Sequence, residues 1–255
     1  AMGPPWERSP SEAREMGTAD GPPRLRPPCH GLRGPGSGPR EVVGTGPAGL
    51  AAAYALLRRG HGAVLFDAHS QPGGMLRYGI PAFRLPREVL DAEIKMIRDL
   101  GAEFRLGQKL GRDVTLDQLR RDFDAVFLAV GAQGSRSLGC AGEELAVQAL
   151  DFLAKITDGQ PPAVGSDALI VGGGNTAMDA SRCALRLGAK SVRVLYRRTR
   201  REMPCLMEEV EAAEAEGVQV EFLVAPVRLE QKNGTLNLTC QRMELGPPDA
   251  SGRAS

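Results

Sequence analysis

The chain has 255 residues, of which 42% are hydrophobic and 25% are charged, and its formal net charge is +1. This is an ordinary globular balance, with room for one large domain or two small ones. The near-neutral net charge does not indicate binding to nucleic acid or to an anionic membrane. No apolar run reaches the ~20 residues of a membrane helix. The start of the chain lacks the layout of a secretory signal. We therefore expect a cytoplasmic protein that binds neither nucleic acid nor membrane.

Metal and disulfide chemistry find little support in the sequence. The five cysteines are scattered, and no two have the C-x-x-C or C-x-x-x-x-C spacing of a metal clip or a redox dithiol. With only 3 histidines, a histidine-based metal site is not expected either. We predict no metal site, and no residue stands out as a catalytic acid, base or nucleophile.

Both ends of the chain are dominated by proline, glycine and serine. Segments such as 21–23 and 34–39 cannot bury enough apolar surface to offset the entropy of ordering them. We expect residues 1–40 to be disordered and residues 246–255 to form a polar tail.

After the first segment, the pattern becomes strand, glycine turn, helix and strand. Residues 42–43 are apolar, residues 48–59 are rich in alanine and leucine, and residues 63–66 are apolar again. The first strand also contains Arg40 and Glu41, which makes it shorter and more polar than a buried central strand normally is.

The following residues extend this first unit. Residues 87–100 have helical apolar spacing, and Thr115 is placed to cap a helix at 116–121. Residues 125–130 are continuously apolar, which predicts a buried strand.

A second cycle of elements then begins. In chain order we expect a helix at 149–156, a linker at 160–165, a strand at 168–171, a helix at 176–187, a strand at 191–195, a helix at 208–216, a strand at 218–224, and strands at 227–230 and 235–240. Asn233-Gly234 between the last two strands is a strong hairpin signal.

These elements predict an α/β protein with two Rossmann-like dinucleotide-binding βαβ domains. The predicted boundaries are a disordered segment at 1–40, a first domain at 41–148, a connector at 149–165, a second domain at 166–245 and a tail at 246–255.

The first glycine motif lies directly between a strand and a helix. It runs Gly44-Thr45-Gly46-Pro47-Ala48-Gly49 and matches G-x-G-x-x-G. Its glycines permit a tight turn, close approach of a pyrophosphate and close helix–strand packing, and the helix N-terminus favours phosphate. Asp67 closes the next strand, 18 residues after Gly49, where an acid would accept hydrogen bonds from an adenosine ribose. A dinucleotide site is therefore favoured over a simple glycine turn.

The second glycine motif has the G-x-G-x-x-A form. It comprises Gly172, Gly173, Gly174, Asn175, Thr176 and Ala177. The acid expected after the next strand is replaced by Arg197 and Arg198, with Arg200 and Arg201 just beyond. Arginines bind a ribose 2′-phosphate that a carboxylate would repel. A solvated basic loop would account for one or two arginines but not for this cluster, so the pattern favours NADPH over NADH.

Longer stretches resemble the small (beta) subunit family of NADPH-dependent glutamate synthases. The resemblance is carried by the residues around the first glycine motif, by Pro72–Pro81 and Phe83–Pro86, by Val171–Ala180 and by Tyr196–Pro204. Dihydropyrimidine dehydrogenase contains a related module, but the Leu-Arg-Tyr-Gly-Ile-Pro sequence is more similar to the glutamate synthase group.

The resemblance implies roles for individual residues. Gly73, Gly74, Met75 and Leu76 would line a flavin, Arg84 would contact FAD, and Gly131 would belong to a second flavin-side turn. Arg197, Arg198 and Arg201 would hold the 2′-phosphate of NADPH, with Asn175 and Thr176 near its pyrophosphate.

The resemblance also implies an FAD domain into which the NADPH domain is inserted. The family's cysteine-rich segment for iron–sulfur clusters is absent, because Cys29 alone cannot ligate a cluster. The family returns to the FAD domain after the NADPH domain, and this chain stops before such a return. We therefore expect a C-terminally truncated fragment.

The function implied is hydride transfer from NADPH to FAD, with electrons passed to a large glutamate synthase-type or iron–sulfur partner subunit. The lack of a cysteine pair disfavours a disulfide reductase. Two alternatives stay open: a non-catalytic nucleotide-binding fragment, and the NAD(P)H-oxidising subunit of another electron-transfer complex.

Overall fold

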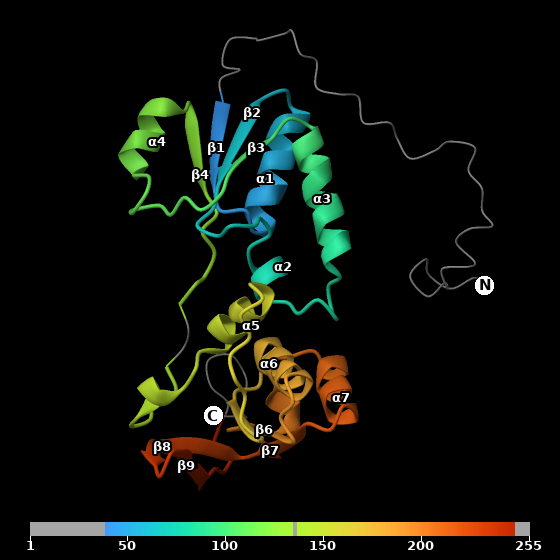
Figure 1. The fold of residues 1–255 in the computed structure, drawn as a ribbon, viewed down its shortest axis with the longest axis vertical. Coiled ribbons are helices and arrows are strands. Elements are labelled where there is room, and N and C mark those ends of the chain that lie inside the picture. The colour runs from blue at the N-terminus through green and yellow to red at the C-terminus, as the bar shows by residue number, and fades with distance from the viewer. Residues whose placement is uncertain (1–38, 135–136, 248–255) are drawn as a thin grey trace, which may run out of the picture.

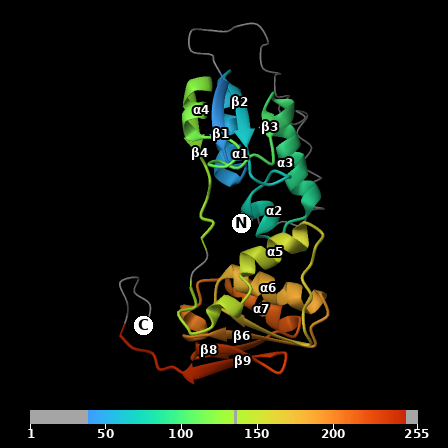
Figure 2. The same cartoon turned by 60° about the vertical axis from the view of Figure 1, so that its left-hand side comes forward.

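The computed structural model describes residues 39–134 and 137–247, and it contains two α/β units arranged along one long axis (Figure 1). The expectations of disorder at 1–40 and of a polar tail at 246–255 fall almost entirely outside these described residues. The turned view again shows two units, with α5 (Ala149–Thr157) on the side of the second unit that faces the first (Figure 2). The chain thus contains two βαβ units, as the sequence predicted.

The first unit is a parallel sheet of 4 strands in the order β3-β2-β1-β4. Its strands are β1 (Pro39–Val43), β2 (Gly62–Phe66), β3 (Glu103–Arg105) and β4 (Ala125–Leu128), and its longer helices are α1 (Pro47–Arg58), α3 (Arg87–Asp99) and α4 (Leu116–Asp122). Strand β3 and the short helix α2 (Met75–Tyr78) were not predicted. The prediction that Thr115 caps α4 is confirmed, because its side chain accepts from the Gln118 amide.

Alternating strand residues and helical spacing build the two faces of this sheet. Val42 and Leu65 pack against the buried face of α1 and against Leu90, Ile94 and Ile97 of α3. On the other face, Leu119 of α4 packs with three strand residues, Val43, Val64 and Phe66.

The prediction of a buried strand at 125–130 is wrong about burial. β4 pairs with β1 on one side only, so it lies at the edge of the sheet. Phe127, Leu128 and Val130 are 47%, 51% and 51% exposed. A continuous apolar run cannot by itself distinguish a central strand from an edge strand.

The second unit contains a parallel sheet in the order β5-β6-β7. Its elements are α5, β5 (Asp167–Val171), α6 (Asn175–Arg186), β6 (Ser191–Tyr196), α7 (Met207–Ala215) and β7 (Gln219–Phe222). Fully buried Met178, Val194, Val210 and Ala213 join the helices to this sheet. Two 3₁₀ turns, Glu143–Leu145 and Arg200–Glu202, complete the connections.

An antiparallel hairpin follows, formed by β8 (Val224–Lys232) and β9 (Thr235–Arg242). Asn233 and Gly234 have φ of 51° and 77°, as a type I′ turn requires, which confirms the hairpin prediction. The strand predicted at 218–224 is too long, because Leu223 has a φ of 56° and redirects the chain into β8.

The polar first strand forms as the central strand β1 and pairs with both β2 and β4. Glu41 is 0% exposed, and among residues 39–134 and 137–247 neither of its carboxylate oxygens has a hydrogen-bond partner. Burial raises the pKa of Glu41 to about 7, with Asp122 adding to the rise and Arg105 opposing it. An unpaired buried carboxyl therefore lies in the middle of the first sheet.

We predict that Glu41→Gln changes stability in a pH-dependent way. The unfolded Glu41 titrates near 4.5 and the folded one near 7, so wild-type stability falls as the pH rises through this window and levels off above it. Replacing Glu41 by Val should raise the unfolding free energy by about 1–3 kcal/mol above pH 7, because it removes an unsatisfied buried group. Urea unfolding between pH 4 and 8 measures both effects.

The control for this experiment is Glu103→Gln, since Glu103 is exposed on β3. If Glu41→Gln and Glu103→Gln gave the same pH dependence, ionisation of Glu41 would not be the cause.

Candidate nucleotide-binding sites

The first glycine turn is built from close backbone contacts. Gly44 has a φ of 109°, and its amide donates to the carbonyl of Phe66 at 2.7 Å. A Cβ at Gly44 would overlap the carbonyl oxygen of Ala129, and a Cβ at Gly49 would overlap the carbonyl oxygen of Gly44. Both positions therefore require glycine.

The turn presents unpaired amides at the start of α1. Pro47 occupies the first helical position, where its missing N–H costs nothing. Within residues 39–134 and 137–247, the amides of Gly46, Ala48 and Gly49 have no hydrogen-bond acceptor. These donors, at the positive end of the helix dipole, can bind an anion.

Asp67 is 9% exposed and is fully engaged with neighbouring residues. It accepts from the Thr45 amide at 2.8 Å and from the Thr45 hydroxyl, and also from the His69 amide at 2.9 Å, while His69 Nδ1 lies 3.0 Å away. Burial alone would raise the pKa of Asp67, but the hydrogen bonds from His69 and Thr45 outweigh it and lower the pKa to about 2. The ionised carboxylate of Asp67 therefore holds the glycine turn in place through Thr45. A contact between Asp67 and a ribose stays a prediction.

A second glycine pair is joined to the same turn. The amide of Gly73 donates to both the carbonyl and the hydroxyl oxygen of Thr45. A Cβ at Gly74 would lie 2.7 Å from the Cα of Gly46, so the two backbones nearly touch. The half-buried Met75 and Leu76 follow at the start of α2.

A third turn lies on the opposite side of Gly44. The amide of Ala129 donates to the carbonyl of Val43 at 2.7 Å, and Gly131 has a φ of 69°. The structure thus brings the turns at residues 44–49, 73–76 and 129–131 together at the carboxyl ends of β1 and β4.

Three residues that support these turns were missed by sequence reasoning. They are Thr45, His69 and Arg77. His69 stacks on Tyr78 with ring centroids 4.2 Å apart. Arg77 is buried, donates to the carbonyl of Pro72 at 2.6 Å and pairs with Asp91. Their polar side chains close to the glycines were the available signal.

The second glycine turn repeats the first in simpler form. Gly172 has a φ of 139°, and its amide donates to the carbonyl of Leu195 at 3.0 Å. A Cβ at Gly173 would lie 2.5 Å from the ring of Tyr196. Four consecutive amides lead into α6. In the part of the chain that the structure describes, they have no hydrogen-bond acceptor; they belong to Gly173, Gly174, Asn175 and Thr176. Ala177 is buried in the core behind them.

The segment before α7 packs on the second turn, which the sequence did not reveal. The amide of Leu206 donates to the Asn175 side chain at 3.0 Å, and the amide of Cys205 donates to the carbonyl of Gly173 at 3.3 Å. The Tyr196 hydroxyl donates to the carbonyl of Glu202 at 2.7 Å. The side chain of Asn175 is thus engaged within the protein, while its amide remains available.

The arginines after β6 differ in their surroundings. Arg197 and Arg201 are exposed, whereas Arg198 is only 5% exposed. Arg200 pairs with Glu214 and lies over the ring of Phe222. Two guanidinium groups are therefore presented to solvent at the end of β6, and a contact between Arg198 and a phosphate stays a prediction.

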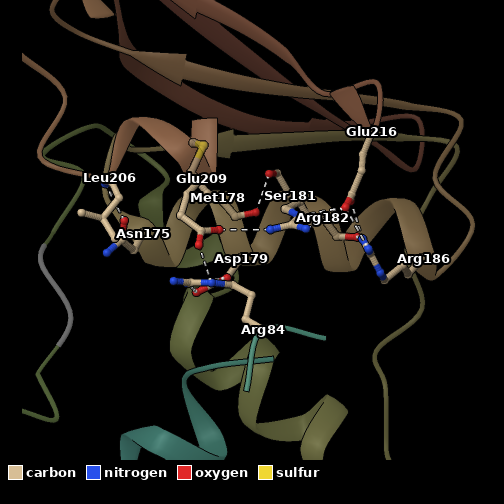
Figure 3. Close-up of polar contacts among 10 residues, drawn as sticks. All are labelled: Arg84, Asn175, Met178, Asp179, Ser181, Arg182, Arg186, Leu206, Glu209 and Glu216. Atoms are coloured by element: carbon tan, nitrogen blue, oxygen red, sulfur yellow. Dashed lines mark hydrogen bonds and ion pairs between the residues drawn. The ribbon is translucent and has the colours of Figure 1, made fainter. Parts of the chain in front are cut away.

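The guanidinium of Arg84 contacts α6 and α7 of the second unit. Its Nη1 donates to both Asp179 oxygens, at 2.9 and 2.8 Å, and its Nε lies 2.8 Å from Glu209 (Figure 3). The contact with FAD implied for Arg84 stays a prediction, because its guanidinium is occupied by two carboxylates of the second unit.

Both turns fit the pyrophosphate of a dinucleotide. Each combines glycines that exclude a Cβ with unpaired amides at the start of a 12-residue helix. Within the described residues, no group of three or more His, Cys, Asp or Glu side chains could hold a metal ion. None of the described helices combines the length and apolar character that crossing a bilayer requires.

We predict that Gly49→Ala disrupts the first turn. The added Cβ would overlap the Gly44 carbonyl oxygen, and relief of that overlap should cost about 1–3 kcal/mol of unfolding free energy or more. The matched control is Gly134→Ala, where nothing lies within 4 Å of the added atom. Equal urea midpoints for the two variants would show that the close approach is not required.

Comparisons with known proteins agree with this geometry. A family model for pyridine nucleotide-disulphide oxidoreductases matches residues 41–245. Over 218 residues the chain is 47% identical to the NADP(+)-dependent formate dehydrogenase subunit beta of Moorella thermoacetica, covering 83% of this chain and 31% of that protein. Over 227 residues it is 42% identical to the glutamate synthase [NADPH] small chain of Escherichia coli (strain K12), covering 83% and 48%. The chain thus spans about a third to a half of the length of these relatives.

Solved structures share the fold. Mycobacterium tuberculosis FprA in complex with NADPH superposes with a TM-score of 0.73 at 20% identity, covering 86% of this chain and 66% of that one. Lactococcus lactis thioredoxin reductase gives a TM-score of 0.59 at 20% identity, covering 86% and 73%. With the matched family model spanning both glycine turns, the chain belongs to the pyridine nucleotide-disulphide oxidoreductase family.

Proposed function

We propose that this chain is the NADPH-oxidising module of a flavoprotein, with FAD on the first unit and NADPH on the second. The observation that carries the proposal is the pair of glycine turns with unpaired helix amides, followed by an acid in one unit and by exposed arginines in the other. Family membership supports an oxidoreductase, and relatives named for NADPH or NADP(+) support the choice of nucleotide.

The first unit would hold FAD mainly through backbone groups. The amides of Gly46, Ala48 and Gly49 would donate to the pyrophosphate. Gly73, Gly74, Met75, Leu76 and Gly131 belong to the turns next to these amides. Asp67 keeps the turn in place through Thr45 and His69 and remains our candidate for the ribose hydroxyls.

The second unit would hold NADPH in a related way. The four unpaired amides from Gly173 to Thr176 would donate to the pyrophosphate. Arg197 and Arg201 would bind the 2′-phosphate, because both are exposed in the segment that follows β6.

The bound nucleotides would supply the redox chemistry, a hydride passing from the nicotinamide C4 to the flavin N5. The protein's part is to bind and orient them. We propose that electrons leave through a partner subunit that carries iron–sulfur or other redox groups. Relatives named as subunits of formate dehydrogenase, of NADPH-Fe(3+) oxidoreductase and of glutamate synthase support a partner without selecting one. We also retain the proposal of a cytoplasmic location.

The test of the proposal is anaerobic reduction of the reconstituted protein. We expect the purified chain to bind FAD, turn yellow and bleach when NADPH is added, with NADH reacting more slowly. Colourless protein after incubation with FAD would contradict the proposal and favour a non-catalytic nucleotide-binding fragment.

We predict that Arg197→Ala weakens the binding of the NADP(H) form of the nucleotide more than that of the NAD(H) form. Loss of a charge-assisted hydrogen bond costs about 1.5–3 kcal/mol, which is about tenfold or more in the dissociation constant. Titration calorimetry with NADP⁺ and NAD⁺ should show weaker NADP⁺ binding and little change for NAD⁺. Arg201→Ala should act in the same direction.

Lys190→Ala is the matched control, since Lys190 is an exposed cation just before the opposite end of β6. An unchanged NADP⁺ preference in Arg197→Ala and Arg201→Ala together would refute the assigned role of these two arginines.

A further inference from the structure

The segment between α2 and α3 reaches from the first unit to the second. Phe83 contacts two arginines of α6, and Arg84 contacts carboxylates of both α6 and α7 (Figure 3). The Arg84–Asp179 contact joins residues that lie 95 positions apart in the chain. A short loop of the first unit therefore lies against the helix whose N-terminus forms the second glycine turn.

Arg84 makes the central contact of this junction. It donates to both oxygens of Asp179 and pairs with Glu209 at 2.8 Å. Asp179 is 3% exposed at its side chain, and burial raises its pKa although Arg84 opposes the rise. A carboxylate so far removed from water needs a cation at hydrogen-bond distance, and Arg84 provides one from the other unit.

The ring of Phe83 packs against two arginines of α6. The guanidinium carbons of Arg182 and Arg186 lie 4.6 and 3.9 Å from its ring centroid. Both arginines are held by ion pairs with Glu216 of the same unit, and Arg182 also pairs with Glu209. Side chains of α6 and α7 that contact Phe83 and Arg84 are therefore held by ion pairs within the second unit. Figure 3 shows these ion pairs.

The rest of the junction combines polar contacts with an apolar cavity. Arg87 donates to the Thr157 hydroxyl of α5 at 3.3 Å, and that hydroxyl donates to the carbonyl of Arg77 at 3.2 Å. A cavity of about 340 Å³, lined mainly by apolar atoms, lies between residues 78–87 and helices α5 and α6. Side chains do not fill this part of the junction, so the direct contacts of Arg84 with Asp179 and Glu209 contribute to the orientation of the units.

We propose that Arg84 is a positioning residue that docks the second unit on the first through Asp179 and Glu209. Asp179 lies one helical turn beyond Asn175, and Arg84 lies in the loop that follows the Gly73–Gly74 turn and helix α2. The Arg84–Asp179 contact thus sets the distance between the two nucleotide turns. Its consequence for hydride transfer rests on the function proposed above, whereas the docking itself does not.

The docking is tested on the full chain by a distance between two labels. Asp117 of α4 and Glu211 of α7, which are both exposed, are each replaced by a keto amino acid. Spin labels are attached to the keto groups, so the cysteines are not labelled. We expect a narrow distance distribution in the wild type and a broad, longer one in Arg84→Met. Arg84→Lys should restore part of the narrow peak, because it retains the charge but not the fork geometry.

Two controls make the result decisive. Arg121→Met removes an exposed cation from α4 and should leave the distribution unchanged. Asp179→Asn, which is nearly isosteric, should broaden it as Arg84→Met does. Circular dichroism establishes that each variant is folded. A narrow, wild-type distribution in folded Arg84→Met and Asp179→Asn would overturn the proposal.

A kinetic measurement connects docking to activity. In single-turnover reduction, Arg84→Met should slow flavin reduction by about tenfold or more, because misplacement of reacting groups is costly. Its dissociation constant for NADP⁺ should stay close to the wild-type value. If FAD does not bind but the label distance responds to Arg84, the proposed function fails and the docking stands. If flavin bleaches at the wild-type rate in an Arg84→Met protein with unchanged distances, the docking fails and the function stands.

Discussion

Close backbone packing at two glycine turns is the constraint on which the rest of the structure depends. At the first turn, Gly44 and Gly49 leave no room for a side chain, and at the second Gly173 lies against the ring of Tyr196. This packing lets α1 and α6 begin a short turn after β1 and β5, and within the described residues their first amides are unpaired. In each unit the same geometry closes the βαβ core and creates a place for an anion. Stability and binding are therefore coupled at these positions.

The two turns have opposite electrostatic surroundings. Asp67 stays ionised beside the first turn, because hydrogen bonds from Thr45 and His69 lower its pKa to about 2 despite its burial. The second turn has no such acid at the corresponding strand end, where Arg197 and Arg201 are exposed instead. This difference is the physical basis for assigning FAD to one unit and NADPH to the other. The Arg84 contacts then determine how far apart the two nucleotides would lie.

Local rules predicted most of the fold. Apolar periodicity located α1, α3 and α6, and the Asn233-Gly234 turn and the Thr115 cap follow from the chemistry of those residues. Burial was harder to predict, because it depends on neighbours that a periodic pattern does not reveal. The apolar β4 lies exposed at an edge, while the polar Glu41 is enclosed in the central strand.

The glycine turns were predictable for the same local reason, whereas the contacts of Arg84, Asn175 and Arg198 were not. Each of these side chains is directed by residues distant in sequence or by burial. The central claim is that the chain binds two different dinucleotides at two turns. A crystal structure grown with FAD and NADP⁺ tests it most directly. The account predicts the FAD pyrophosphate at the start of α1, the NADP⁺ pyrophosphate at the start of α6, and the 2′-phosphate bonded to Arg197 or Arg201. A 2′-phosphate remote from both arginines, or an α1 turn that binds no FAD, would contradict it.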